Sequence, residues 1–177
     1  GVISDATRLE AVVAAVNRSA WIAVDTEADS LHAYPEKLCL LQFSLGSGDY
    51  LVDSLAGLDL SKLLAALANR ELIFHGADYD LRMLRKTFDF VPAKIFDTMT
   101  APRLLGYTQF GLGHLVERHL SVKPEKGPQK MNWARRPLTP RMEEYARNDT
   151  RFLKQLSDIL RAELEAKGRL RWQEETC

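Results

Sequence analysis

This sequence of 177 residues has few cysteines, no long apolar run and no excess of either charge. Cys39 and Cys177 are far apart, and they suggest neither a disulfide framework nor a metal site. Without 18 consecutive apolar residues or a signal-peptide pattern, we expect a soluble cytoplasmic protein with no membrane partner. The 24 basic and 24 acidic side chains balance, so net charge neither favours nor excludes a nucleic-acid partner.

The pattern of apolar residues predicts an α/β fold. Hydrophobic content of 46% suits a single globular domain over residues 1–177, which we expect to be a monomer. Helical spacing predicts helices after Ser4 and Asp5, over 60–69 and 78–88, and from Thr139 and Pro140 onward as one long helix. Short apolar runs predict strands at 21–27, 37–44, 49–53, 72–75 and 95–97. This order favours a mixed β-sheet flanked by α-helices.

Two acids end the first predicted strand, in the stretch "AVDTEADSL". Asp25 and Glu27 are two positions apart, so in a strand they point to the same face, about 7 Å from each other. Taken alone, the pair also fits a capping Asp25 and a solvated Glu27. Two acids on helices favour a shared site. Asp149 falls on the apolar stripe of the last helix, and Asp80 lies at the edge of the apolar face of the 78–88 helix.

A cluster of four carboxylates facing a core requires a positive charge. Two like charges 4 Å apart repel by about 4 kcal/mol at the effective dielectric of a protein surface. Ligation by oxygen alone selects a hard divalent ion, Mg²⁺ or Mn²⁺, and the chain lacks a convincing His/Cys set for zinc. The sequence therefore predicts a divalent cation site formed by Asp25, Glu27, Asp80 and Asp149.

Four segments in order resemble the motifs of the RNase D family, within the DEDD superfamily of 3′-to-5′ exonucleases. They are "AVDTEADSLHAYPEKLCLLQFS", "FHGADYDLRML", "FDTMTAPRLLG" and "NWARRPLTPRMEEYARNDTRFL". Relatives include the exonuclease subunit of the nuclear exosome. The resemblance implies a ribonuclease H-like fold of the DnaQ-like exonuclease type. Tyr145 lies four residues before Asp149, and this spacing resembles the pattern of the tyrosine subclass of these exonucleases.

The resemblance implies hydrolysis of the 3′-terminal phosphodiester of single-stranded RNA with two divalent ions, releasing 5′-mononucleotides. Asp25 would bridge both ions. Glu27 and Asp149 would complete the site that activates water, and Asp80 would hold the second ion beside the leaving oxygen. Tyr145 would orient the attacking water, because a phenol with a pKa near 10 is a poor general base. A purely structural, core position for Tyr145 is the alternative.

Residues 121–138 form a predicted basic loop, either a solvated segment or an arm for a phosphate backbone with an aromatic side chain for base stacking. His32 is either a ribose or phosphate contact or a simple loop residue. Gln42 alternates with apolar residues in its strand and is expected to face the substrate groove. The expected substrate-binding residues are His32, Gln42, Lys130, Trp133 and Arg136.

Three functions remain open from the sequence. An RNA 3′-exonuclease leads, and a DNA exonuclease of the same chemistry is the near alternative, because the metal site does not read the 2′-hydroxyl. A catalytically silent nucleic-acid-binding module is the third. Asn132 and Asn148 depart from acids common in the family, outside the metal set. Longer bacterial members continue into helical nucleic-acid-binding domains that this sequence does not include.

Overall fold

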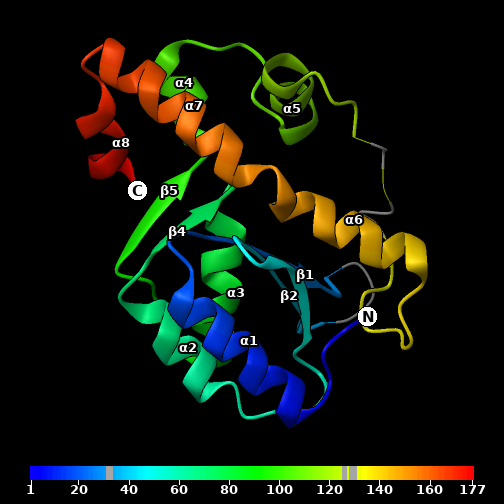
Figure 1. Ribbon diagram of the computed structural model, residues 1–177. Coiled ribbons are helices and arrows are strands. Elements are labelled where there is room, and N and C mark those ends of the chain that lie inside the picture. The colour runs from blue at the N-terminus through cyan, green and yellow to red at the C-terminus, as the bar shows by residue number, and fades with distance from the viewer. Residues whose placement is uncertain (31–33, 125–126, 128–130) are drawn as a thin grey trace.

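The computed structural model describes residues 1–30, 34–124, 127 and 131–177. Its centre is one mixed sheet of five strands in the order β3-β2-β1-β4-β5 (Figure 1). The first three strands are antiparallel neighbours, whereas β4 and β5 run parallel to β1. The strands are β1 (Ile22–Ala28), β2 (Leu38–Leu45), β3 (Gly48–Asp53), β4 (Glu71–Phe74) and β5 (Lys94–Asp97). The predicted mixed α/β sheet is confirmed, and β2 and β3 form an antiparallel hairpin.

Helices cover both faces of this sheet (Figure 1). One layer contains α1 (Ala6–Arg18), α2 (Ser61–Ala68) and α3 (Asp78–Phe88). The other contains α6 (Pro140–Arg151) and α7 (Leu153–Ala166), with α4 (Thr100–Leu105), α5 (Leu112–Leu120) and α8 (Leu170–Thr176) beside them. Successive side chains of β1 point to opposite faces of the sheet, so the strand packs against both helix layers. Val24 packs into the core with α1, α2 and α3, whereas Ala23 packs with α4 and α7.

The last predicted helix begins as expected, but it is two helices rather than one. Thr139 is the N-cap of α6, and its side chain accepts a hydrogen bond from the Met142 amide, with Pro140 at the first helical position. The helix ends at Arg151, and α7 follows after Phe152. Thr150 Oγ1 donates back to the Arg147 carbonyl over 3.4 Å, an arrangement that often bends helices. The apolar stripe continues across this break, so periodicity alone did not reveal it.

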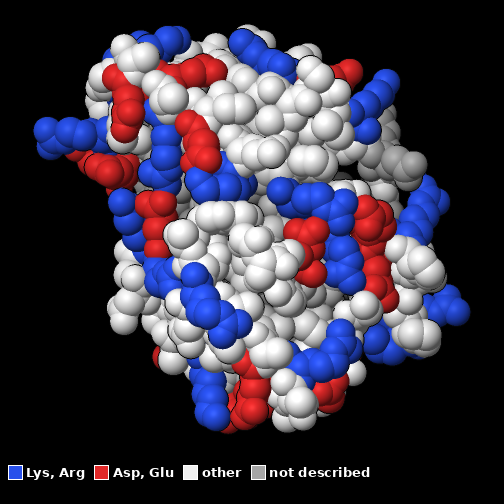
Figure 2. Space-filling model, viewed as in Figure 1, with Lys and Arg blue, Asp and Glu red and all other residues white. Residues whose placement is uncertain are grey.

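The surface agrees with the balanced composition. Lys and Arg side chains lie interspersed with Asp and Glu on the face seen in Figure 2. Within the described ranges, no helix has both the length and the apolar character needed to cross a membrane.

Candidate active site

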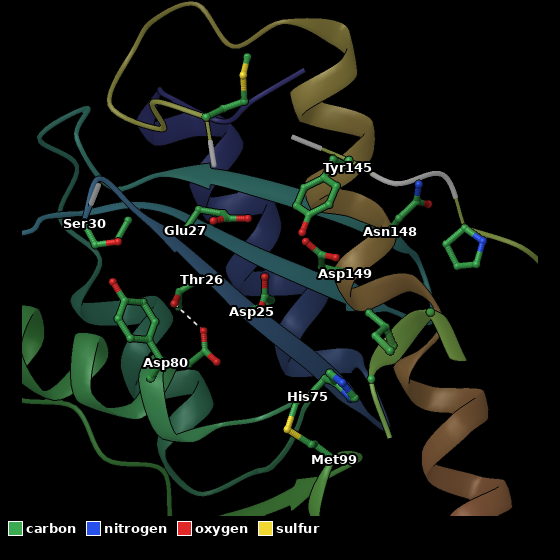
Figure 3. Close-up of a pocket in the computed structure, with 18 residues that line it drawn as sticks. Asp25, Thr26, Glu27, Ser30, His75, Asp80, Met99, Tyr145, Asn148 and Asp149 are labelled. Atoms are coloured by element: carbon green, nitrogen blue, oxygen red, sulfur yellow. Dashed lines mark hydrogen bonds between the residues drawn. The ribbon is translucent and has the colours of Figure 1, made fainter. Parts of the chain in front are cut away.

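Three acids gather between β1 and α6. Because side chains alternate along a strand, Asp25 and Glu27 share the face of β1 that carries Ala23, toward the α6 layer. Asp149 reaches them from the last turn of α6 (Figure 3). One carboxylate oxygen of each residue lies within 4.8 Å of the others. The predicted clustering of strand and helix acids is therefore present in the fold.

Asp80 approaches from the other side of β1. It lies in the first turn of α3, is buried, and accepts a 2.5 Å hydrogen bond at Oδ1 from Thr26 Oγ1 (Figure 3). Thr26 falls between the two strand acids, so it points toward α3 while they point toward α6. Asp80 is outside the group of three within 4.8 Å, yet its charge is close enough to raise the pKa of Glu27.

The start of α3 is fixed by an acid from β5. The carboxylate of Asp97 accepts hydrogen bonds from the amides of Gly76 at 2.8 Å and Ala77 at 3.0 Å. Gly76 has a φ of 77°, which is accessible to glycine with little strain. Asp78 does not cap this helix, because it lies within the first turn and pairs with Arg82. Asp97 instead holds the two residues that precede the helix, and it thereby helps to fix where the helix that carries Asp80 begins.

The electrostatics of the cluster are those of uncompensated negative charge. Burial, followed by the charges of Asp80, Asp149 and Glu27, raises the pKa of Asp25 well above its ordinary value. Burial and the neighbouring acids likewise raise the pKa of Glu27 to about 9. For Asp149, burial raises the pKa to about 7. Burial raises the pKa of Asp80 to about 6, although the Thr26 hydroxyl opposes that increase.

This donor set fits hard divalent cations. Carboxylate oxygens are the ligands that Mg²⁺ and Mn²⁺ prefer, and imidazole or thiolate ligands are not part of the group of three. Asp25, Glu27, Asp80 and Asp149 form no ion pair with Lys, Arg or His among the described residues. A divalent ion would therefore supply the positive charge that this part of the protein lacks.

Tyr145 lies one helical turn before Asp149, and its hydroxyl points toward that carboxylate (Figure 3). Burial, followed by the charges of Asp149, Glu27 and Asp25, raises the pKa of Tyr145 far above its ordinary value. The phenol therefore keeps its proton and acts as a hydrogen-bond donor, not as a base. The water-orienting role that the resemblance implies for Tyr145 stays a prediction.

The structure places three of the expected substrate-binding residues in positions where their side chains contact the rest of the fold. Trp133 is 1% exposed and packs against Tyr145, with ring centroids 6.1 Å apart, so its side chain is not available for base stacking. Arg136 holds Asp53 through two hydrogen bonds of 2.7 Å and is therefore committed to the fold. Gln42 is fully buried and donates to Asp25, so it faces the acids rather than an open groove.

These three placements correct the expected substrate set. The interior position of Trp133 follows from its packing beside β2 and α6, which a loop composition does not reveal. His32 and Lys130 lie outside the described residues.

The acids line a cavity of about 990 Å³. Residues that sequence reasoning missed also line it: Thr26, Ser30, His75, Tyr79, Met99 and Met131. Thr26 had a usable signal, because a hydroxyl between two acids of a strand must face the opposite helix layer. Tyr79 and Met131 are exposed and adjoin the cavity, where an apolar surface suits a nucleobase.

Fold and acid cluster together define a class of protein, an α/β domain with an all-carboxylate centre for divalent cations. Residues 1–165 match the family described as 3′-5′ exonuclease. Ribonuclease D of Zymomonas mobilis subsp. mobilis is 37% identical over 175 residues, covering 96% of this chain and 45% of that protein. The crystal structure of Escherichia coli RNase D has a TM-score of 0.93 at 29% identity, covering 100% of this chain and 48% of that one.

Brucella melitensis NrnC is also similar, in one structure bound to pGG and in another with bound Mg²⁺. Their TM-scores are 0.82 and 0.79, at 29% and 28% identity. Each covers 90% of this chain, and the alignments span 80% and 81% of the NrnC chains.

The chain therefore belongs to the 3′-5′ exonuclease family. The ribonuclease H-like fold implied by the resemblance is confirmed by the match to RNase D. The chain spans about half the length of the RNase D proteins it matches.

Proposed function

We propose that this protein is a metal-dependent 3′-5′ exoribonuclease that removes 5′-mononucleotides from the 3′ end of single-stranded RNA. The observation that carries the proposal is the convergence of Asp25, Glu27 and Asp149 within 4.8 Å, with Asp80 beside them. Similarity to RNase D supports RNA as the substrate. We also propose one domain over residues 1–177, a monomeric state, a cytoplasmic location and a role in RNA processing or turnover.

The four acids would hold two divalent ions, Mg²⁺ or Mn²⁺. Bound there, the ions would supply Lewis-acid stabilisation for the attacking and leaving oxygens of an in-line displacement. Asp25 lies between the other acids and suits the bridging position. Glu27 and Asp149 would hold one ion, and Asp80 would hold the other from the α3 side of the strand. The Mg²⁺ in the NrnC structure supports magnesium as one usable metal.

Other side chains of the protein would orient the attacking water and contact the terminal nucleotide. The Tyr145 hydroxyl keeps its proton and orients the attacking water, because burial and neighbouring charges hold its pKa far above neutrality. The cavity of about 990 Å³ receives the terminal nucleotide. Tyr79 and Met131 offer it exposed aromatic and thioether surface. These contacts are independent of base identity, which suits an enzyme that removes every nucleotide in turn.

A second candidate substrate is a very short oligonucleotide. It is favoured by the similarity to NrnC, which was solved with pGG. The chemistry at the scissile bond would be the same, and only the number of nucleotides held by the cavity and its rim would differ.

The test is a time course with 5′-labelled single-stranded RNA, matched DNA and a diribonucleotide, in Mn²⁺, Mg²⁺ or EDTA. A metal-dependent ladder that shortens RNA from its 3′ end supports the proposal. Faster loss of DNA would replace RNA as the substrate class, and turnover of the dinucleotide alone would favour the short-substrate candidate. Binding without cleavage in every metal would overturn the enzymatic function, with Asp25→Asn as the inactive control.

A further inference from the structure

Gln42 is a polar residue in an otherwise largely apolar, fully buried strand. All eight residues of β2 are buried, and the Gln42 side chain has no exposed surface. The antiparallel register places it directly opposite Asp25. Its Nε2 donates a 3.1 Å hydrogen bond to Asp25 Oδ2. The side chain thus contacts the acid that lies among the other carboxylates.

The remainder of the Gln42 amide is poorly accommodated. Its Oε1 is buried and has no hydrogen-bond partner within the described part of the chain. Ser44, two positions along the same strand face, is fully accommodated, because its hydroxyl contacts Asp49 at 2.6 Å and Thr150 at 2.8 Å. A buried acceptor without a partner lowers the stability of the fold, and an apolar side chain of the same size would avoid that loss. Folding alone therefore does not account for a glutamine at this position.

We propose that Gln42 is a positioning residue that holds the Asp25 carboxylate in the orientation needed to bind both divalent ions. A carboxylate on a single χ2 torsion rotates readily, and a bridging ligand must present its two oxygens in different directions. The Gln42 N–H fixes Oδ2 at one position and thereby sets the direction of Oδ1. This inference rests on the proposed function, in which Asp25 bridges the ions.

A neutral donor is the suitable chemistry for this task. Lysine or arginine at position 42 would also orient Asp25, but its charge would neutralise the carboxylate and compete with the cations. An amide stabilises the carboxylate by hydrogen bonding and leaves the full negative charge for the metals. Thr26 offers the same kind of support to Asp80, again from a neutral group. Partners of metal ligands typically change metal affinity or activity by about 10–100-fold when removed.

The proposal predicts that removing the Gln42 amide preserves or raises the stability of the metal-free protein but lowers its affinity for divalent ions. Gln42→Met keeps the length of the side chain, removes the N–H and also removes the unpaired Oε1. We expect its metal-free Tm to equal or exceed that of the wild type. We expect its affinity for Mn²⁺, followed by electron paramagnetic resonance of the free ion, to fall by about 10–100-fold. The value of kcat should fall with it, whereas KM for RNA at saturating Mn²⁺ should stay close to wild type.

Leu40→Met is the matched control, because Leu40 lies on the same strand face, opposite Glu27, and is equally buried. It should leave Mn²⁺ affinity unchanged. Gln42→Leu repeats the test in case the methionine variant folds poorly. Unchanged Mn²⁺ affinity in a folded Gln42 variant would overturn the proposal. So would a loss of affinity that only accompanies lower stability and is matched by Leu40→Met.

The metal titration contains no nucleic acid, so it separates this inference from the proposed function. A wild-type protein that binds Mn²⁺ but degrades no RNA would refute the exoribonuclease proposal and still allow the Gln42 test.

Discussion

The hydroxyl of Thr26 donates a 2.5 Å hydrogen bond to Asp80 Oδ1, across 54 positions of sequence. It joins β1, which carries two of the acids, to the first turn of α3, which carries a third. Thr26 points away from Asp25 and Glu27. One short strand segment therefore supplies two acids on the α6 side and holds Asp80 on the α3 side. The relationship explains how Asp80, set apart from the other three acids, is held in a fixed place.

Removing this hydroxyl should shift the pH dependence of catalysis. The Thr26 bond favours the charged form of Asp80, whose pKa burial has already raised to about 6. In Thr26→Val the pKa of Asp80 rises further, so the acidic limb of kcat/KM moves to higher pH. A hydrogen bond to a charged group is worth about 1.5–3 kcal/mol, which corresponds to a shift of about one pH unit or more. The measurement is a pH–rate profile at subsaturating Mn²⁺.

Thr26→Ser is the matched control for that profile, because it retains the donor. It should keep the acidic limb at the wild-type pH. A valine variant with an unshifted limb would show that Asp80 does not depend on this bond.

The removal of one metal ligand should abolish activity without unfolding the protein. Asp149→Asn keeps the volume of the side chain but removes a negative charge from a group that lies within 4.8 Å of Asp25 and Glu27. We expect kcat to fall by more than the factor of about 100 seen at the upper end for partners of ligands. Mn²⁺ affinity, measured by calorimetry, should fall as well. The control is Asp158→Asn, an exposed change on α7 where Asp158 pairs with Lys154.

Near wild-type turnover by Asp149→Asn would remove Asp149 from the catalytic set. A parallel loss in Asp158→Asn would instead indicate a general effect of altered surface charge.

Local patterns predicted much of the fold. The strands and the hairpin follow from short apolar runs, and the start of α6 follows from Thr139 and Pro140, because each signal is contained in a few adjacent residues. The break at Phe152 was missed, since the apolar stripe continues through it while the Thr150 hydroxyl bonds back to the helix.

In the candidate site, too, local patterns predicted the placement of some residues, whereas contacts across the fold decided the positions of others. Strand alternation and helix periodicity found the acids, because those patterns fix the direction of a side chain within its own element. The positions of Trp133 and Arg136 depend on what lies across the fold, namely Tyr145 and Asp53. A loop composition carries no information about such partners. The composition of the basic loop therefore predicted substrate contacts for Trp133 and Arg136, whereas both side chains contact other parts of the fold.

Arg136 should prove structural when tested. Its guanidinium donates to both oxygens of Asp53, as well as to backbone carbonyls of Cys39 and Trp133. Arg136→Lys keeps the charge but loses the two-pronged geometry, and we expect a loss of about 2 kcal/mol of stability. For a domain of this size, that corresponds to a decrease in Tm of about 4–8 °C. The salt dependence of RNA binding should not change.

The exposed neighbour Arg135 provides the contrast. If Arg135 contacts a phosphate, Arg135→Gln should reduce the slope of log affinity against log salt by about 0.7 and leave Tm unchanged. A reduced slope in Arg136→Gln at wild-type stability would return Arg136 to the substrate-binding set.

The charge held by Glu27 should make the metal-free protein less stable as pH rises. Burial and the neighbouring acids raise its folded-state pKa to about 9, above the ordinary value of 4.5. The folded state then binds more protons than the unfolded state between these values, so stability present below about pH 4.5 is lost as pH rises through about 9. Glu27→Gln cannot ionise. We expect its metal-free Tm to exceed that of the wild type at pH 8–9, and to differ less at pH 5.

Saturating Mn²⁺ should reverse this order, because an ion that binds only the folded state adds about 2.7 kcal/mol at 100 times its Kd. The wild type gains that stability, whereas Glu27→Gln lacks a ligand and gains little. Glu165→Gln, an exposed change on α7, should follow the wild type in both conditions. Thermal scans from pH 5 to 9, with EDTA or Mn²⁺, measure all three proteins. If Glu27→Gln were less stable than the wild type in EDTA at pH 9, repulsion among the acids would not be what the metal relieves.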